Sequence, residues 1–132
     1  MISTKGRYAL RVMLDLAAHA ADGYVPLRDV AERQGISKKY LEIIVKDLVN
    51  GGLVSGVSGK GGGYRLCRAA AEYSVGEILD CTEGSLAAVA CLDRGAAPCP
   101  RAAQCPTLPL WEEYDRLTRA FFYGKRLSEL MG

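Results

Sequence analysis

Two amphipathic segments flank a tight turn at Gly35-Ile36-Ser37. Gly35 suits the left-handed conformation that ends a helix, and Ser37 suits the cap of the next helix. The segments run from about Leu27 to Gln34 and from Ser37 to about Asn50, and the second places four apolar residues at helical spacing: Leu41, Ile44, Val45 and Leu48. The pattern predicts a helix-turn-helix, which is the most strongly organised stretch of the chain.

A glycine-rich segment follows the second of these helices. Two strand-like runs, Leu53 to Val57 and Tyr64 to Cys67, are joined by residues 58–63, which read Ser-Gly-Lys-Gly-Gly-Gly. This spacing predicts a β-hairpin with a glycine-rich tip, the wing of a winged helix. A phosphate-binding P-loop does not fit, because Gly61 stands where that motif needs Ser or Thr and the earlier glycine is missing.

Three more helices are predicted outside this unit. An apolar stripe runs through residues 3–21, and His19 lies off that stripe, so we expect it to be an exposed surface residue. Ser74-Val75-Gly76-Glu77 is a capping box that starts a helix ending near Gly84. A last helix starts near Leu108, with an apolar seam typical of helices that pack against a partner helix: Leu110, Tyr114, Leu117 and Phe121.

The predicted fold class is mainly α with a small β wing. The predicted division is residues 1–83, expected to be a winged helix-turn-helix DNA-binding domain, and residues 84–132, expected to hold a cysteine loop and a dimerisation helix. The length of 132 residues fits this size of protein, and 49% hydrophobic and 24% charged residues are typical of a soluble globular chain. The absence of a signal-peptide core and of a long apolar run favours a cytoplasmic protein with no membrane contact.

The charge is distributed unevenly along the chain. Residues 1–70 carry eleven Lys and Arg against six Asp and Glu, whereas residues 71–132 carry six against nine. The basic half is therefore the candidate for nucleic-acid binding. An enzyme is not expected, because a single off-face histidine without clustered carboxylates offers no acid-base machinery.

The candidate DNA contacts are the start of the third predicted helix and the wing tip. Residues at the start of such a helix reach base edges in the major groove, while a glycine-rich tip carrying a lysine suits the minor groove or the backbone. Glu42 either accepts a hydrogen bond from cytosine or forms an ion pair with Lys46 on a solvated face. Tyr40 fits either a DNA contact or the core. The candidate set is Lys5, Ser37, Lys38, Lys39, Tyr40, Glu42, Lys60 and Gly61.

Three cysteines, Cys91, Cys99 and Cys105, lie in the irregular segment from Ser85 to Pro106 with spacing C-x7-C-x5-C. Five cysteines cannot all pair within one chain, so metal or redox chemistry is favoured over a disulfide framework. Iron-sulfur is favoured over zinc, because no paired C-x2-C knuckle is present. A zinc site, a thiol switch without a cluster, and small apolar residues remain alternatives.

The chain resembles the family of small winged-helix regulators that contains IscR, NsrR and CymR. The resemblance covers essentially the whole chain, and its most specific motifs are Ser3 to Leu10, Val30 to Ser37 with Tyr40-Leu41-Glu42, Gly59 to Tyr64, and Ser74 to Ile78. It implies a homodimer that binds pseudo-palindromic double-stranded promoter DNA, with the C-terminal helix making the dimer contact. An alternative is a winged helix that acts through a protein partner.

The resemblance also implies that Cys91, Cys99 and Cys105 ligate a [2Fe-2S] or [4Fe-4S] cluster, because the cluster-binding members carry three cysteines in this loop. IscR-like members supply a histidine three residues after the last cysteine, where this chain has Leu108, and NsrR-like members use an acidic residue where it has Tyr8. The fourth ligand therefore stays open among Asp93, Glu112, Glu113, a small thiol and water.

Overall fold

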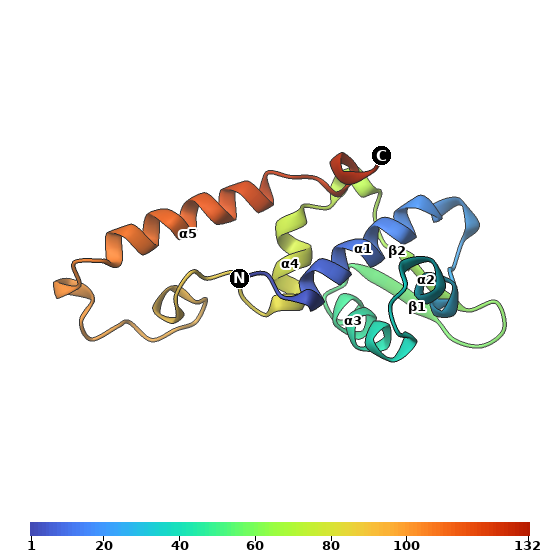
Figure 1. Ribbon diagram of the computed structural model, residues 1–132, viewed down its shortest axis with the longest axis horizontal. Helices are drawn as coiled ribbons and strands as arrows, with labels where there is room; N and C mark the ends of the chain where they lie inside the picture. Colours follow the sequence, from blue (N-terminus) through green and yellow to red (C-terminus); the bar gives the residue numbers. More distant parts are fainter.

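The computed structural model describes residues 1–132. Five helices and one hairpin make up its regular structure (Figure 1), with short 3-10 turns between them. The elements are α1 (Thr4–Ala18), α2 (Leu27–Gln34), α3 (Lys38–Asn50), β1 (Val54–Val57), β2 (Gly63–Leu66), α4 (Val75–Glu83) and α5 (Leu108–Tyr123). The predicted fold class, mainly helical with a small β wing, is confirmed.

Local sequence signals set the helix starts. The hydroxyl oxygens of Ser3, Ser37 and Ser74 accept hydrogen bonds from the third backbone N–H that follows each of them, at 3.2, 3.1 and 3.1 Å. Gly35 has φ 65°, the left-handed conformation expected after α2. The predicted boundaries of the helix-turn-helix and of the capping box at residue 74 are therefore confirmed.

Two expectations about the first helix are wrong. It ends at Ala18 rather than Ala21, because the chain tightens into a 3-10 turn at Ala20–Asp22. His19 caps the helix end, and its side chain is partly buried, with Nδ1 2.9 Å from the carbonyl oxygen of Asp15. The cause is that Asp15 on the preceding turn is itself buried and holds the imidazole against the body.

The hydrophobic core lies where α1, α2, α3 and α4 meet the base of the wing. The apolar side chains predicted for α3 face inward, and Ile78 and Leu79 of α4 are buried as well. The largest buried side chains include Met13, Leu16, Leu41, Ile44, Leu48, Tyr73, Ile78 and Leu127.

The wing is an antiparallel hairpin in which Val54 pairs with Leu66 and Val57 pairs with Gly63. Val25 adds a third extended piece, exchanging backbone hydrogen bonds of 2.8 and 2.9 Å with Tyr64. Gly61 at the tip has φ 77°, a conformation that a side chain would strain. The hairpin prediction is confirmed to within one residue at each strand end.

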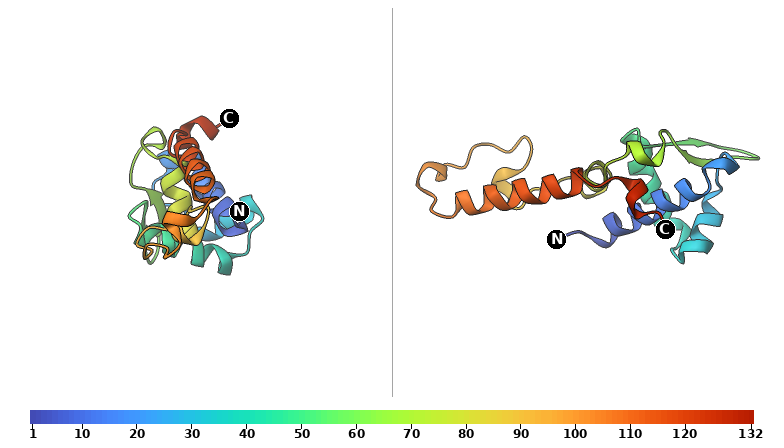
Figure 2. Two further views of the ribbon diagram at one scale, coloured as in Figure 1. Left: turned by 90° about the vertical axis from the view of Figure 1, so that its left-hand side faces the viewer. Right: turned by 90° about the horizontal axis from the view of Figure 1, so that it is seen from above.

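Helix α5 extends away from this body, together with the cysteine loop, which we define as residues 84–107 (Figure 2). The wing and the cysteine loop lie at opposite ends of the long axis of the molecule (Figure 1). After α5 the chain returns to the body, where the N–H of Leu127 donates to the carbonyl of Tyr73 at 3.0 Å. The division into domains at residue 83 stays a prediction, and Leu127 shows that the last residues pack into the core of the first part.

None of the helices combines the length and apolar character needed to cross a bilayer.

Candidate nucleic-acid interface and cysteine loop

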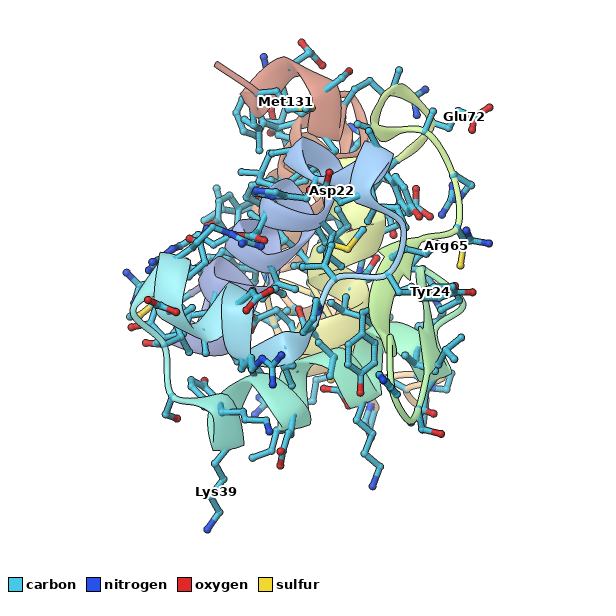
Figure 3. All side chains as sticks on the ribbon, turned by 90° about the vertical axis from the view of Figure 1, so that its right-hand side faces the viewer. Asp22, Tyr24, Lys39, Arg65, Glu72 and Met131 are labelled. Atoms are coloured by element: carbon cyan, nitrogen blue, oxygen red, sulfur yellow. The ribbon has the colours of Figure 1, made fainter.

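Helix α3 has a polar outer face that points away from the hydrophobic core. Four of its side chains at positions 38, 39, 42 and 46 are exposed, while its apolar side chains at positions 41, 44, 45 and 48 are buried. Figure 3 shows Lys39 pointing away from the body at the start of this helix. The exposed first turn also carries the free N–H groups of a helix N-terminus, which favour phosphate.

The wing and α2 border this face with further positive charge. A hollow of about 530 Å³ lies between the wing tip and the first residues of α2 and α3. It is lined by three basic side chains, Arg28, Lys38 and Lys60. Gly61 lines the same hollow. The hollow thus brings the predicted wing residues and the start of α3 to one surface, and it adds Arg28, which the sequence analysis missed.

Glu42 lies in a second hollow of about 390 Å³ between α3 and the strands of the wing. The same hollow is lined by Lys46, Asn50 and Ser58. Glu42 and Lys46 do not form an ion pair. Glu42 therefore faces the space between α3 and the wing strands, on the same helix as Lys38 and Lys39.

Three candidates are less available for DNA contact than the sequence suggests. Lys5 on α1 forms an ion pair with Asp47 of α3, so its ammonium group ties two helices together. Tyr40 is partly buried, and its ring packs edge-on against the ring of Tyr8 at 5.8 Å between centroids. The Ser37 hydroxyl caps α3. That Lys5, Ser37 and Tyr40 contact DNA stays a prediction.

A buried carboxylate fixes the position of the helix-turn-helix. Arg33 donates two hydrogen bonds to Asp15, of 3.0 and 2.8 Å, and the amide of Gln34 donates a third of 2.9 Å. Burial raises the pKa of the Asp15 carboxyl, but the hydrogen bonds from Arg33 and Gln34 outweigh it and hold the pKa below its usual range. This contact locks the end of α2, and hence the turn into α3, onto α1.

Tyr73 fixes the base of the wing. Its hydroxyl donates to the Leu53 carbonyl at 2.6 Å and accepts from the N–H groups of Cys67 and Arg68 at 2.9 and 3.0 Å. Arg68 also stacks on its ring and pairs with Glu77 of the capping box. One buried hydroxyl therefore holds the chain on both sides of the hairpin.

The three cysteines of the loop are free and lie on irregular backbone. Cys91 is exposed, and Cys99 and Cys105 are partly exposed. The backbone hydrogen bonds of this segment join residues three positions apart, as between Leu92 and Val89. No group of three His, Cys, Asp or Glu side chains lies close enough to hold a metal ion, so this conformation does not bring the thiols together.

The Cys105 thiol differs electrostatically from that of Cys81. Hydrogen bonds from the side chain and backbone of Thr107 and from the backbone of Leu108 lower the pKa of Cys105. Burial, followed by the charge of Asp47, raises the pKa of Cys81. Cys81 is packed between α4 and α3, where its thiol donates to the Asp47 carbonyl at 3.1 Å.

Helix α5 has no buried residue, although its sequence has an apolar seam. Leu110, Tyr114, Leu117 and Phe121 are each 55–60% exposed. A groove of about 670 Å³ runs between this helix, the N-terminal residues and the start of the cysteine loop, and most of its lining is apolar. Large apolar side chains exposed along one face of a helix form the kind of patch that marks an interaction surface.

The sequence and the fold have counterparts in known proteins. The model of the Rrf2 family, described as an iron-dependent transcriptional regulator, matches residues 2–132. The chain belongs to the Rrf2 family. The HTH-type transcriptional regulator IscR of Photobacterium profundum is 42% identical over 130 residues, which are 98% of this chain and 74% of that protein.

Two solved structures have a similar fold. T. potens IscR superposes with a TM-score of 0.76 at 32% identity, covering 98% of this chain and 85% of that one. CymR, the global cysteine regulator of B. subtilis, superposes with a TM-score of 0.77 at 32% identity, covering 98% and 95%. This Rrf2 protein is accordingly a transcriptional regulator with a winged-helix DNA-binding fold, and the expectation that it resembles the IscR and CymR group is confirmed.

The structure of this Rrf2 protein brings together Lys38, Lys60 and Gly61, but it does not gather Cys91, Cys99 and Cys105. Arg28 was missed because an exposed arginine on a short helix gives no sequence signal of its own. Its position two residues after Pro26, where a helix begins, was the one available hint.

Proposed function

We propose that this Rrf2 regulator binds double-stranded promoter DNA as a homodimer, and that its DNA affinity depends on an iron-sulfur cluster held by Cys91, Cys99 and Cys105. The observation that carries the proposal is the pairing of a basic winged-helix surface with three free thiols on one loop of the same chain. The matched family is described as iron-dependent, which agrees with the soft donor set.

The DNA-binding part of the proposal rests on α3 and the wing. Helix α3 would lie in the major groove with Lys38 and Lys39 near phosphates and Glu42 toward a base edge. Lys60 and Gly61 at the wing tip would reach the adjacent minor groove or backbone, and Arg28 would add a phosphate contact on the same side.

The homodimer is supported by the exposed seam of α5. A second copy of the helix would cover Leu110, Tyr114, Leu117 and Phe121 and also close the apolar groove beside the N-terminus. A symmetric dimer presents two recognition helices, which matches the two half-sites of a pseudo-palindrome.

The donor chemistry of the cysteine loop fits an iron-sulfur cluster, since three thiolates are the ligand type that such clusters require. The loop would have to close for the thiols of Cys91, Cys99 and Cys105 to meet. When bound, the cluster would supply iron that can change its oxidation state or be lost from the protein, so that its presence reports the conditions in the cell. A fourth ligand is not assigned: Leu108 stands where IscR-like proteins have histidine, and Asp93, Glu112 and Glu113 are the nearby carboxylates in sequence.

Contacts at the start of the cysteine loop connect it to α3 by way of α1, and also to α5. At its start, Glu83 accepts hydrogen bonds from the N–H and hydroxyl of Ser3, at 3.0 and 2.7 Å, and α1 is in turn paired to α3 through Lys5 and Asp47. On α5, Asp115 accepts from the backbone N–H of Ala88 at 3.0 Å. A change in the loop would therefore bias the position of α4 and α1, and through them the recognition helix.

The test is anaerobic purification followed by visible absorption and by iron and sulfide analysis. Alanine at Cys91, Cys99 or Cys105 should abolish the absorption, while Cys67→Ala and Cys81→Ala should leave it intact. Colourless protein with bound zinc would favour the zinc alternative. Reconstituted protein that binds no metal, or that binds iron equally well without Cys99, would contradict the cluster.

Regulation is tested separately from metal binding. Cluster-loaded and apo protein should differ in affinity for at least one selected DNA sequence, measured by fluorescence anisotropy at fixed salt. Equal affinities for every sequence would leave the cysteines without a role in DNA binding. DNA binding that responds to oxidation in metal-free protein would favour a thiol switch.

A further inference from the structure

The outer face of α3 carries one apolar side chain among its charged ones. Ile43 is 50% exposed. It follows Lys39 by four residues and precedes Lys46 by three, so all three side chains lie on the same face of the helix. Lys39, one turn earlier, points away from the body (Figure 3), and Ile43 therefore lies on the side of α3 most distant from the core.

Ile43 differs from the other exposed apolar residues near the wing. Val49 and Val57 are 38% and 48% exposed, but both line the hollow between α3 and the wing strands, where they contribute to the concave surface. Ile43 lines neither that hollow nor the one at the wing tip. Half of its surface stays open to solvent, and the lysines on either side of it attract phosphate.

We propose that Ile43 is a specificity-determining residue that contacts the C5-methyl group of a thymine in the major groove. The inference rests on the proposed function, because it requires α3 to lie in that groove. Ile43 has no side-chain donor or acceptor, so it cannot distinguish the nitrogen and oxygen atoms of base edges. The thymine methyl is the one apolar group that the major groove presents, and an aliphatic side chain between two phosphate-binding lysines is placed to meet it.

The experiment compares thymine with uracil, which lacks only the methyl group. A binding site is first selected from a random DNA pool with the anaerobically purified full-length protein. Each thymine of the site is then replaced singly by uracil, and dissociation constants are measured for the wild type, Ile43→Ala and Val49→Ala at one low salt concentration.

The wild type should lose about fourfold in affinity at one thymine per half-site, equivalent to ~0.8 kcal/mol for one buried methyl group. Ile43→Ala should bind the thymine and uracil sites equally, whereas Val49→Ala should keep the uracil penalty. Because the ratio of the two affinities is compared, a general loss of binding by Ile43→Ala does not obscure the result.

Two results would overturn the inference while leaving DNA binding intact: no uracil substitution weakens the wild type, or Ile43→Ala keeps the same penalty. If the wild type enriches no sequence at all, the proposed function and this inference fail together. The unfolding midpoint of Ile43→Ala should match the wild type, because the side chain is not part of the core.

Discussion

Replacing Tyr73 with Phe should be among the most destabilising single-atom deletions in this protein. Tyr73 is fully buried, and its hydroxyl makes three hydrogen bonds to backbone groups on both sides of the wing. Phenylalanine keeps the ring in the core, so the change isolates the hydroxyl. The wing should lose its anchor to the body while the hydrophobic contacts stay.

The magnitude follows from the burial of the three partners. The Leu53 carbonyl belongs to a buried residue and would keep only a long hydrogen bond of 3.4 Å from the N–H of Cys67, so losing the tyrosine donor should cost about 1–3 kcal/mol, the range for a buried polar group that loses its partner. The N–H groups of Cys67 and Arg68 lie nearer the surface, where water can replace part of the lost bond, so each should add roughly 0.5 kcal/mol. The total is about 2–4 kcal/mol, or roughly 10 °C in the melting temperature of a domain of this size.

Urea denaturation followed by circular dichroism measures the loss, at one protein concentration for all variants because dimer formation would shift the midpoint. Tyr24→Phe is the matched control: the Tyr24 ring is partly buried under Arg65, so its unfolding free energy should change by less than about 0.5 kcal/mol. If Tyr73→Phe unfolds at the same urea concentration as Tyr24→Phe, the hydroxyl does not anchor the wing.

Four further predictions concern the acid stability, the dimer and the DNA surface. Because the pKa of Asp15 is lowered on folding, its contribution to stability is present above its unfolded pKa of about 3.9 and is lost as the pH falls through the folded value. Asp15→Asn should therefore lower the free energy of unfolding at neutral pH and flatten its dependence on acid pH, as measured by urea titrations. An unchanged pH profile would refute this prediction. Leu117→Glu should give monomers by light scattering, since it places a charge in the α5 seam, and a persistent dimer would place the interface elsewhere. Lys39→Ala should weaken binding to all DNA sequences alike and reduce the salt slope by about one if it contacts phosphate, whereas a base contact should cost roughly 1–3 kcal/mol at one position. Glu42→Ala should leave the best site bound and admit new sequences, and an unchanged binding profile would return Glu42 to the solvated face.

The positions of the helices and of the hairpin were predictable because they depend on neighbours in sequence. Ser37 and Ser74 cap helices through backbone groups three residues away, and Gly35 adopts the left-handed conformation that its lack of a side chain permits. The apolar spacing in α3 and α4 likewise needs only the period of the helix. The helix-turn-helix and the hairpin together predicted the fold class, and the resemblance of several such motifs to one family agreed with it.

The contacts that build the functional surfaces were decided by the tertiary structure. Asp15 and Arg33, or Lys5 and Asp47, form pairs only because separate helices pack side by side, and no spacing along the chain predicts such pairs. Burial of Asp15 also drew His19 inward, against the expectation from its place off the apolar stripe. The separation of Cys91, Cys99 and Cys105 was also decided by the tertiary structure. The sequence determines that three thiols share a loop, but the backbone path of that loop determines how far apart they lie.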